Sequence, residues 1–123
     1  MTSRLEHTST NREIHDFLVR RCEEAYEAWT RQVAVARAIR SEVDAAAGDQ
    51  AALASGRAQL DEQDALAKEL RRQLDDLSVA VERSQQGRYG RCDDCDAMIP
   101  GDRLEIFPAA GRCVACEQRR DDR

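Results

Sequence analysis

A repeat of apolar residues every three or four positions limits the fold of this 123-residue chain more than any other feature. Its first stretch starts after Arg12 and consists of Ile14, Leu18, Cys22, Ala25, Trp29, Ala36, Ile39 and Val43. Such spacing places apolar side chains on one face of an amphipathic α-helix, and no Pro or Gly interrupts it before Gly48. Asn11 is the expected N-cap, and the Ser- and Thr-rich residues 1–11 are expected to form a flexible leader.

A second periodic stretch follows, with apolar residues seven apart and companions three positions further on. The residues seven apart are Leu53, Leu60, Ala67, Leu74 and Val81, and the apolar companions are Leu70 and Leu77. Two other companion positions hold Gly56 and Gln63, which suit an apolar face poorly. Gly48 and Asp49 are typical of a C′ glycine and of the N-cap of the next helix. Because so short a connection folds two helices back on each other, we predict an antiparallel helical hairpin, a coiled coil, over residues 12–86 with its tip near residues 47–52. A compact bundle is the less favoured alternative, since only 4% of the residues are aromatic.

Three residues of the first predicted helix have side chains that often belong to functional sites. Cys22 lies on the apolar face and is predicted to pack as a small hydrophobic residue. Tyr26 and Trp29 are predicted to pack in the hairpin or against a second unit, and not to bind a ligand.

Charge and hydropathy exclude several functions. A formal net charge of −5 argues against a protein whose main work is to grip nucleic acid phosphates, so we expect no direct DNA binding. No apolar run approaches the roughly 20 residues that a bilayer requires, and the N-terminus has no apolar signal segment. We therefore expect a cytoplasmic protein without membrane association, and a monomer in preference to an oligomer.

Four of the five cysteines form two Cys-x-x-Cys loops, called knuckles below, with 17 residues between them. The first knuckle holds Cys92 and Cys95, and the second holds Cys113 and Cys116. Two such loops bring four thiolates to about 2.3 Å from one tetrahedral metal ion. A unit of about 30 residues buries too little apolar surface to fold alone. We therefore predict one structural Zn²⁺ in a small finger over residues 87–123 that ends in a short helix from Glu117.

Other uses of these cysteines are disfavoured, and we predict no enzymatic activity. Asp93, Asp94 and Asp96 oppose the lowered thiol pKa that a redox pair requires. Disulfides are rare in the cytoplasm, and four thiolate ligands leave no open position for catalysis at zinc. Arg91 and Arg112 each precede a knuckle and are expected to offset the negative charge of the thiolates.

The finger resembles that of the DksA/TraR family. The matching positions are Gly87, Tyr89, Gly90, Cys92, Cys95, Ile99, Arg103, Leu104, Glu105, Pro108, Cys113 and Cys116. Proteins of this family are bacterial transcription regulators that bind RNA polymerase directly and do not contact DNA. The resemblance implies a coiled coil that enters the polymerase secondary channel, with its tip near the active site.

At the hairpin tip the family commonly carries an acidic motif in which an aspartate and an alanine matter. The resemblance implies that Asp49 and Ala51, with Asp44 just before them, contact the partner. Counted back from Cys92, the family's aspartate falls near Ala52, so Asp49 lies three residues early. Either the hairpin is slightly longer than in the family or the motif is degenerate, and Asp49 has the alternative role of capping the second helix.

The finger itself departs from the family pattern at one position. Asp96 stands where the family usually has glycine, and we expect it to alter the turn and to add negative charge. Some relatives bind ppGpp together with the polymerase, but no clear set of basic residues here matches that function. The alternative to a DksA-like regulator is a non-enzymatic zinc-finger coiled-coil adaptor that binds another protein partner.

Overall fold

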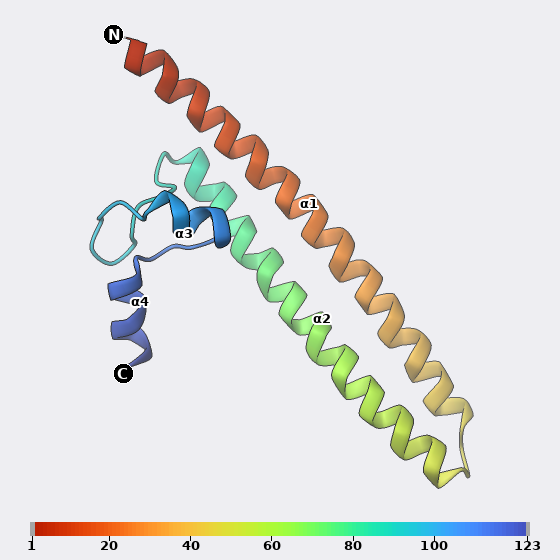
Figure 1. Ribbon diagram of the computed structural model, residues 1–123. Helices are drawn as coiled ribbons and strands as arrows, with labels where there is room; N and C mark the ends of the chain where they lie inside the picture. Colours follow the sequence, from red (N-terminus) through yellow and green to blue (C-terminus); the bar gives the residue numbers. More distant parts are fainter. Residues whose placement is uncertain (1, 123) are drawn as a thin grey trace. The chain divides into compact units, whose positions relative to one another are not determined.

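The computed structural model describes residues 2–122 and is mainly helical (Figure 1). Within this range the helices are α1 (Thr2–Ala45), α2 (Gln50–Gln85), α3 (Gly101–Ile106) and α4 (Val114–Asp121). Helices α1 and α2 form the long antiparallel pair that the periodicity predicts. None of the helices in the described range is long and apolar enough to cross a membrane.

Helix α1 starts earlier than the sequence predicts. It begins at Thr2, so residues 2–11 are helical where the sequence predicts a flexible leader; the flexibility of residues 1–11 stays a prediction, and residue 1 lies outside the described range. Asn11 is inside the helix and does not cap it. No Pro or Gly stands in this segment, and Ser and Thr reduce helix propensity by only a few tenths of a kcal/mol per residue, about 0.5 at most.

The turn between α1 and α2 follows the predicted capping pattern. Gly48 has a φ of 95°, in the left-handed region that glycine adopts at least cost. The Asp49 carboxylate accepts a hydrogen bond from the Ala52 amide at 3.1 Å, which is the N-cap interaction expected for α2. The two residues thus end one helix and start the next within four positions.

The chain divides into two compact units. The hairpin unit is Glu23–Leu74, and the finger unit combines Met1–Cys22 with Asp75–Arg123. The predicted boundary at residue 87 differs from this division. It assigns residues 12–22 of α1 and the residues of α2 after Leu74 to the hairpin, whereas here they belong to the finger unit. Polar contacts explain the difference. The Arg83 guanidinium pairs with the Asp93 carboxylate, and within the same unit His15 Nδ1 lies 3.2 Å from Ser84 Oγ.

In the hairpin unit the two helices meet along a seam, the row of positions that the apolar periodicity predicts on each helix, with Gln32 in addition. The buried and half-buried seam positions are Ala25, Trp29, Gln32, Ala36, Ile39 and Val43 of α1, and Leu53, Gly56, Leu60, Gln63, Ala67, Leu70 and Leu74 of α2. The Gln32 side-chain amide donates to the side-chain and backbone oxygens of Gln63, the latter at 3.2 Å. A polar layer therefore occupies one of the two positions that the sequence marks as poor.

Trp29 packs between the helices of the hairpin unit, as predicted. The Arg71 guanidinium of α2 lies 4.9 Å from the centre of the Trp29 ring, and the Tyr26 ring centre lies 6.0 Å from it. A cation over an indole face is attracted by the ring's electron density. Trp29 is thus part of the packing within this unit.

The finger unit has its own small core. Leu18 is its largest fully buried side chain. A second cluster consists of Cys92, Ile99 and Cys116, with Leu104 and Cys113 packed against it. Helix α4 starts at Val114, three residues before the predicted Glu117. The reason is that the backbone oxygen of Cys113 already accepts the Glu117 amide at 3.0 Å, so the second knuckle forms the first turn of the helix.

Candidate metal centre

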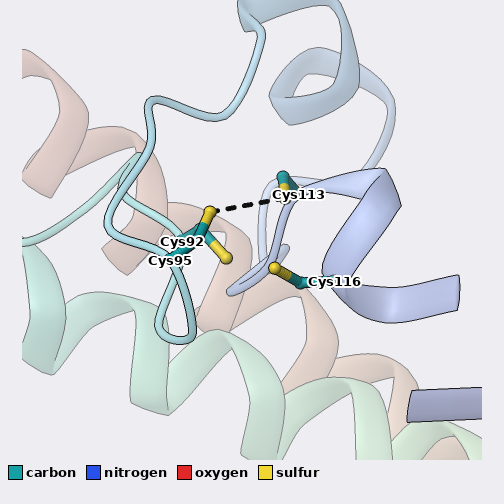
Figure 2. Close-up of side chains that lie close together, drawn as sticks. All are labelled: Cys92, Cys95, Cys113 and Cys116. Atoms are coloured by element: carbon teal, nitrogen blue, oxygen red, sulfur yellow. Dashed lines mark hydrogen bonds between the residues drawn. The ribbon is translucent and has the colours of Figure 1, made fainter. Parts of the chain in front are cut away.

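The four predicted ligands lie together in the finger unit (Figure 2). The Sγ atoms of Cys92, Cys95, Cys113 and Cys116 are all within 4.8 Å of one another, and those of Cys95 and Cys113 are 3.8 Å apart. A tetrahedron with metal–sulfur bonds of about 2.3 Å has edges of about 3.8 Å. The donor set and the sulfur spacing therefore fit one Zn²⁺, which the four cysteines would hold without an open position.

Backbone hydrogen bonds shape the first knuckle. The Cys92 amide donates to the Ala97 oxygen at 2.8 Å, and the Asp96 amide donates to the Cys92 oxygen at 2.9 Å. Asp96 has a φ of 61° in this turn. Asp96, at the position where the DksA/TraR pattern usually has glycine, thus adopts the left-handed backbone conformation that glycine favours. The Ile99 amide donates to Gly90 at 2.7 Å and closes the loop behind the knuckle.

Thiols of the cluster shift one another's pKa values. Hydrogen bonds from backbone groups, that of Cys113 foremost, lower the pKa of the Cys92 thiol to about 6, although the neighbouring aspartates were expected to oppose a lowered thiol pKa. The side-chain hydrogen bond with Cys113 is the main cause that raises the pKa of the Cys116 thiol to about 12. Because a thiol with a raised pKa is protonated at neutral pH and zinc binds the thiolate, zinc binding is expected to release protons from this cluster.

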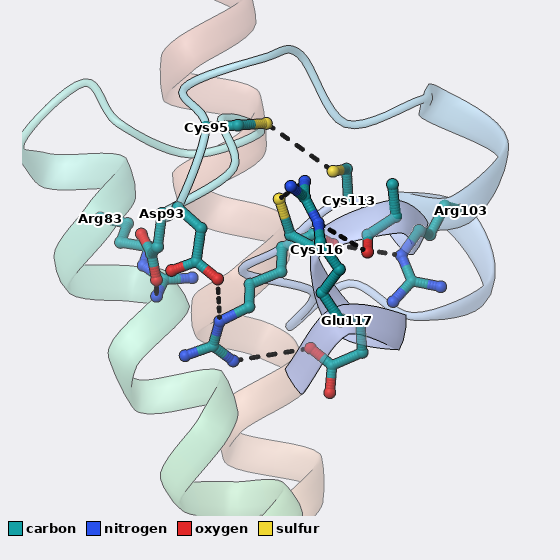
Figure 3. A network of polar contacts seen from close by, with 11 residues as sticks. Arg83, Asp93, Cys95, Arg103, Cys113, Cys116 and Glu117 are labelled. Atoms are coloured by element: carbon teal, nitrogen blue, oxygen red, sulfur yellow. Dashed lines mark hydrogen bonds and ion pairs between the residues drawn. The ribbon is translucent and has the colours of Figure 1, made fainter. Parts of the chain in front are cut away.

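The two arginines expected to offset the thiolate charge instead pair with carboxylates. Arg112 Nε lies 3.3 Å from Asp94 Oδ2, and its Nη1 lies 3.5 Å from Oε2 of Glu117, which is labelled in Figure 3. Arg91 Nη1 lies 3.4 Å from Asp96 Oδ2. Asp94 lies in the first knuckle, while Asp96 and Glu117 directly follow a knuckle, so carboxylates are within reach of both guanidinium groups and the predicted compensation of the thiolate charge stays untested. Arg112 thereby links the first knuckle to α4.

A different arginine reaches the sulfur cluster. Arg119 Nη2 donates a hydrogen bond to Cys116 Sγ at 3.1 Å. Arg119 was not among the residues predicted to act at the metal. Its spacing from Cys116 could have indicated the contact, because a residue three positions after a helical cysteine lies on the same face of the helix.

The loop between the knuckles is fixed by two further contacts within the finger unit. The Tyr89 hydroxyl donates to the Pro108 oxygen at 2.8 Å, and burial raises the pKa of this phenol. Arg83 pairs with Asp93 and lies directly against Gly111, where a side chain would collide with the guanidinium. These contacts connect α2 and the region around the first knuckle with the chain just before the second knuckle. The spacing of residues in the sequence does not reveal them.

The three residues implied to contact a partner lie around the hairpin turn. Asp44 is in the last turn of α1, Asp49 precedes α2 and Ala51 lies in its first turn. All three are exposed, and so is Ala52, where the family's aspartate would fall. The Asp49 carboxylate is also the acceptor that caps α2.

Comparisons with known proteins bear on the finger first. Residues 87–122 match the family described as "Prokaryotic dksA/traR C4-type zinc finger". This segment is therefore similar to the zinc fingers of that family. The C4 description agrees with the clustered cysteines, and together they indicate one structural Zn²⁺. A comparison with curated proteins finds no match.

A solved structure extends the likeness beyond the finger. The chain is similar to the "Structure of transcription factor DksA2 from Pseudomonas aeruginosa", with a TM-score of 0.77 and 25% sequence identity. The match covers 93% of this chain and 84% of that one. Both similarities, in the finger and over most of the chain, agree with the DksA/TraR resemblance that the sequence predicts.

Proposed function

We propose that this protein is a DksA-like regulator that binds RNA polymerase through the secondary channel and modulates transcription initiation. One observation carries the proposal: a DksA/TraR-type finger follows an antiparallel helix pair, and the chain matches a DksA2 transcription factor over 93% of its length. The regulator acts in the cytoplasm as a monomer. Its net charge of −5 favours a protein surface over DNA as the direct partner.

In this proposal the hairpin turn carries the regulatory contact. Asp44, Asp49 and Ala51 are exposed on both sides of the turn, so a partner can reach them. Carboxylates at this end suit a basic or Mg²⁺-containing site, since Mg²⁺ prefers oxygen ligands. The zinc ion then has a structural task, because Cys92 and Cys116 are buried at the cluster.

Competition for the polymerase tests the proposal. The zinc-loaded protein is titrated into its host's RNA polymerase in the presence of a Gre protein, which occupies the secondary channel. We expect the two proteins to exclude each other. Binding to the polymerase without competition, or no binding at micromolar concentrations, would contradict the proposed site.

A second candidate is a zinc-finger coiled-coil adaptor that binds another protein partner. The observation in its favour is that the Asp49 carboxylate already has a structural role as the cap of α2. The two candidates differ in whether the negative charge of Asp49 is needed once the cap is preserved.

Asp49→Asn separates the charge from the cap, because asparagine caps helices about as well as aspartate. For a regulator we expect Asp49→Asn to abolish the effect on initiation while the α2 helix and polymerase binding remain. The matched control is Asp61→Asn, the same change at an exposed α2 position in the same unit. An unaltered effect of Asp49→Asn on initiation would favour the adaptor.

A further inference from the structure

Arg119 contacts the sulfur cluster from within α4. Its Nη2 lies 3.1 Å from Cys116 Sγ, and its Nε lies 3.4 Å from the Ala115 oxygen, so the guanidinium is fixed at two atoms. Arg91 and Arg112, by contrast, pair with carboxylates. Arg119 is therefore the arginine whose charge the structure directs at a predicted zinc ligand.

A zinc ion with four thiolates carries a net charge of about −2, which must be balanced locally in a small domain. Hydrogen bonds in which one partner is charged are stronger than neutral ones, and an arginine remains protonated under all ordinary conditions. Groups that hydrogen-bond to metal ligands typically change metal affinity by about 10- to 100-fold. A cationic donor on one sulfur therefore acts on the metal through that ligand.

We propose that Arg119 retains the zinc ion by donating a charge-assisted hydrogen bond to Cys116 Sγ. Arg119 is a positioning residue, since it acts through Cys116 and does not touch the metal. The inference concerns the zinc centre alone and does not depend on the proposed binding to RNA polymerase. It also gives α4 a defined task, because this helix supplies both the ligand and the residue that supports it.

Arg120 provides a matched control on the same helix. Asp94, Cys95, Cys116, Arg119 and Arg120 line one shallow surface hollow in the finger unit. Arg119 and Arg120 are both exposed, so neither substitution removes a core contact. Replacement of either by glutamine removes one positive charge close to the cluster, but only Arg119→Gln also removes the hydrogen bond to Cys116.

The first measurement is the rate of zinc transfer from the loaded protein to the chromophoric chelator 4-(2-pyridylazo)resorcinol at constant neutral pH. We expect Arg119→Gln to release zinc about tenfold faster than the original protein. Arg120→Gln is expected to release it at nearly the original rate. Equal rates for the two variants would overturn the proposal.

The second measurement separates contact with the sulfur from a general effect on α4. Co²⁺ replaces zinc, and the sulfur-to-cobalt charge-transfer absorption is recorded for each protein, with circular dichroism as a check on helix content. Loss of a hydrogen bond to Cys116 Sγ raises the energy of the sulfur electrons, so Arg119→Gln should shift this band to longer wavelength. An unshifted band with faster zinc loss would assign Arg119 a purely structural role and overturn the proposal.

Discussion

Asp96 is a residue whose backbone conformation suits another amino acid better. Its φ of 61° makes it the only non-glycine residue with positive φ in the part of the chain that the structure describes. For a residue with a Cβ the left-handed region costs about 1–2 kcal/mol, and aspartate is among the residues that tolerate it best. The ion pair with Arg91 is open to solvent at 3.4 Å and contributes little.

We therefore expect Asp96→Gly to stabilise the finger by about 0.5–1 kcal/mol, because relief of strain exceeds the greater flexibility of glycine in the unfolded chain. Asp96→Ala should destabilise it, since alanine has the Cβ but cannot form the local hydrogen bonds of aspartate. The measurement is the thermal midpoint of the zinc-loaded variants. A lower midpoint for Asp96→Gly than for the original protein would contradict the expectation.

Tyr89 makes the stability of the finger depend on alkaline pH. Burial raises the pKa of its phenol above the ordinary value of 10, and the neutral hydroxyl donates to Pro108. The unfolded chain then loses this proton at lower pH than the folded one, so the free energy of unfolding decreases as the pH rises above about 10. Below that pH the contribution is fully present.

Tyr89→Phe removes this titration together with the hydrogen bond. We expect a loss of about 1 kcal/mol at neutral pH and a shallower decline in the thermal midpoint between pH 9 and about 11 than in the original protein. Tyr26→Phe is the control, because Tyr26 is exposed and belongs to the hairpin unit. An equally steep alkaline decline in Tyr89→Phe would assign the effect to another group.

At this scale the sequence predicts the ligands and not their surroundings. The cysteines are predictable because their spacing within each knuckle is itself the coordination requirement. The contacts of Arg119 with Cys116 and of Tyr89 with Pro108 depend on how α4 and the inter-knuckle loop fold. The ion pairs of Arg112 with Asp94 and Glu117 were likewise not predicted, because they form only once the first knuckle and α4 come together.

At the level of helices, Gly56 controls how closely α1 and α2 approach. A Cβ at this position would lie 2.7 Å from Val43 Cγ2, closer than two carbon atoms can pack. The valine has a restricted χ1 angle, so its methyl group cannot easily turn aside. The glycine that weakens the helix thus permits a contact between helices.

Gly56→Ala tests this account because two effects oppose each other. Alanine increases helix propensity by about 1 kcal/mol, whereas overpacking costs about 1–3 kcal/mol. We expect a net loss of about 1 kcal/mol in the free energy of unfolding of the hairpin unit, measured by urea titration. In the double variant Gly56→Ala with Val43→Ala, the loss in the free energy of unfolding should be smaller than the sum of the losses in the two single variants. Losses that simply add would contradict the contact.

The helices also show which patterns in the sequence carry information. The antiparallel pair and its Gly48–Asp49 turn were predictable because both a seven-residue repeat and a capping pattern are local properties. The start of α1 was wrong because polar composition does not stop a helix in the absence of Pro or Gly. Helix α3 spans six residues after Pro100, too few for a periodic signal.

In the whole molecule the two units are stabilised by different means. The hairpin unit relies on its seam and on the packing of Trp29 with Arg71, whereas the finger unit has a small core of aliphatic and cysteine side chains. Trp29 is the single tryptophan of the chain, so its fluorescence reports on the hairpin unit alone. The metal and the helix pair can therefore be followed separately.

We expect zinc removal to unfold the segment that carries the knuckles while the hairpin unit persists. Helices α3 and α4 have only six and eight residues, against 44 and 36 in α1 and α2, so a chelator should reduce the helical signal in circular dichroism only slightly. Trp29 emission should stay unchanged, because neither Trp29 nor Arg71 belongs to the finger unit. Cys95→Ser, which lacks one of the four thiolates, should mimic the chelator without altering the seam. A cooperative loss of Trp29 emission and helical signal on chelation would instead show that the metal stabilises both units as one.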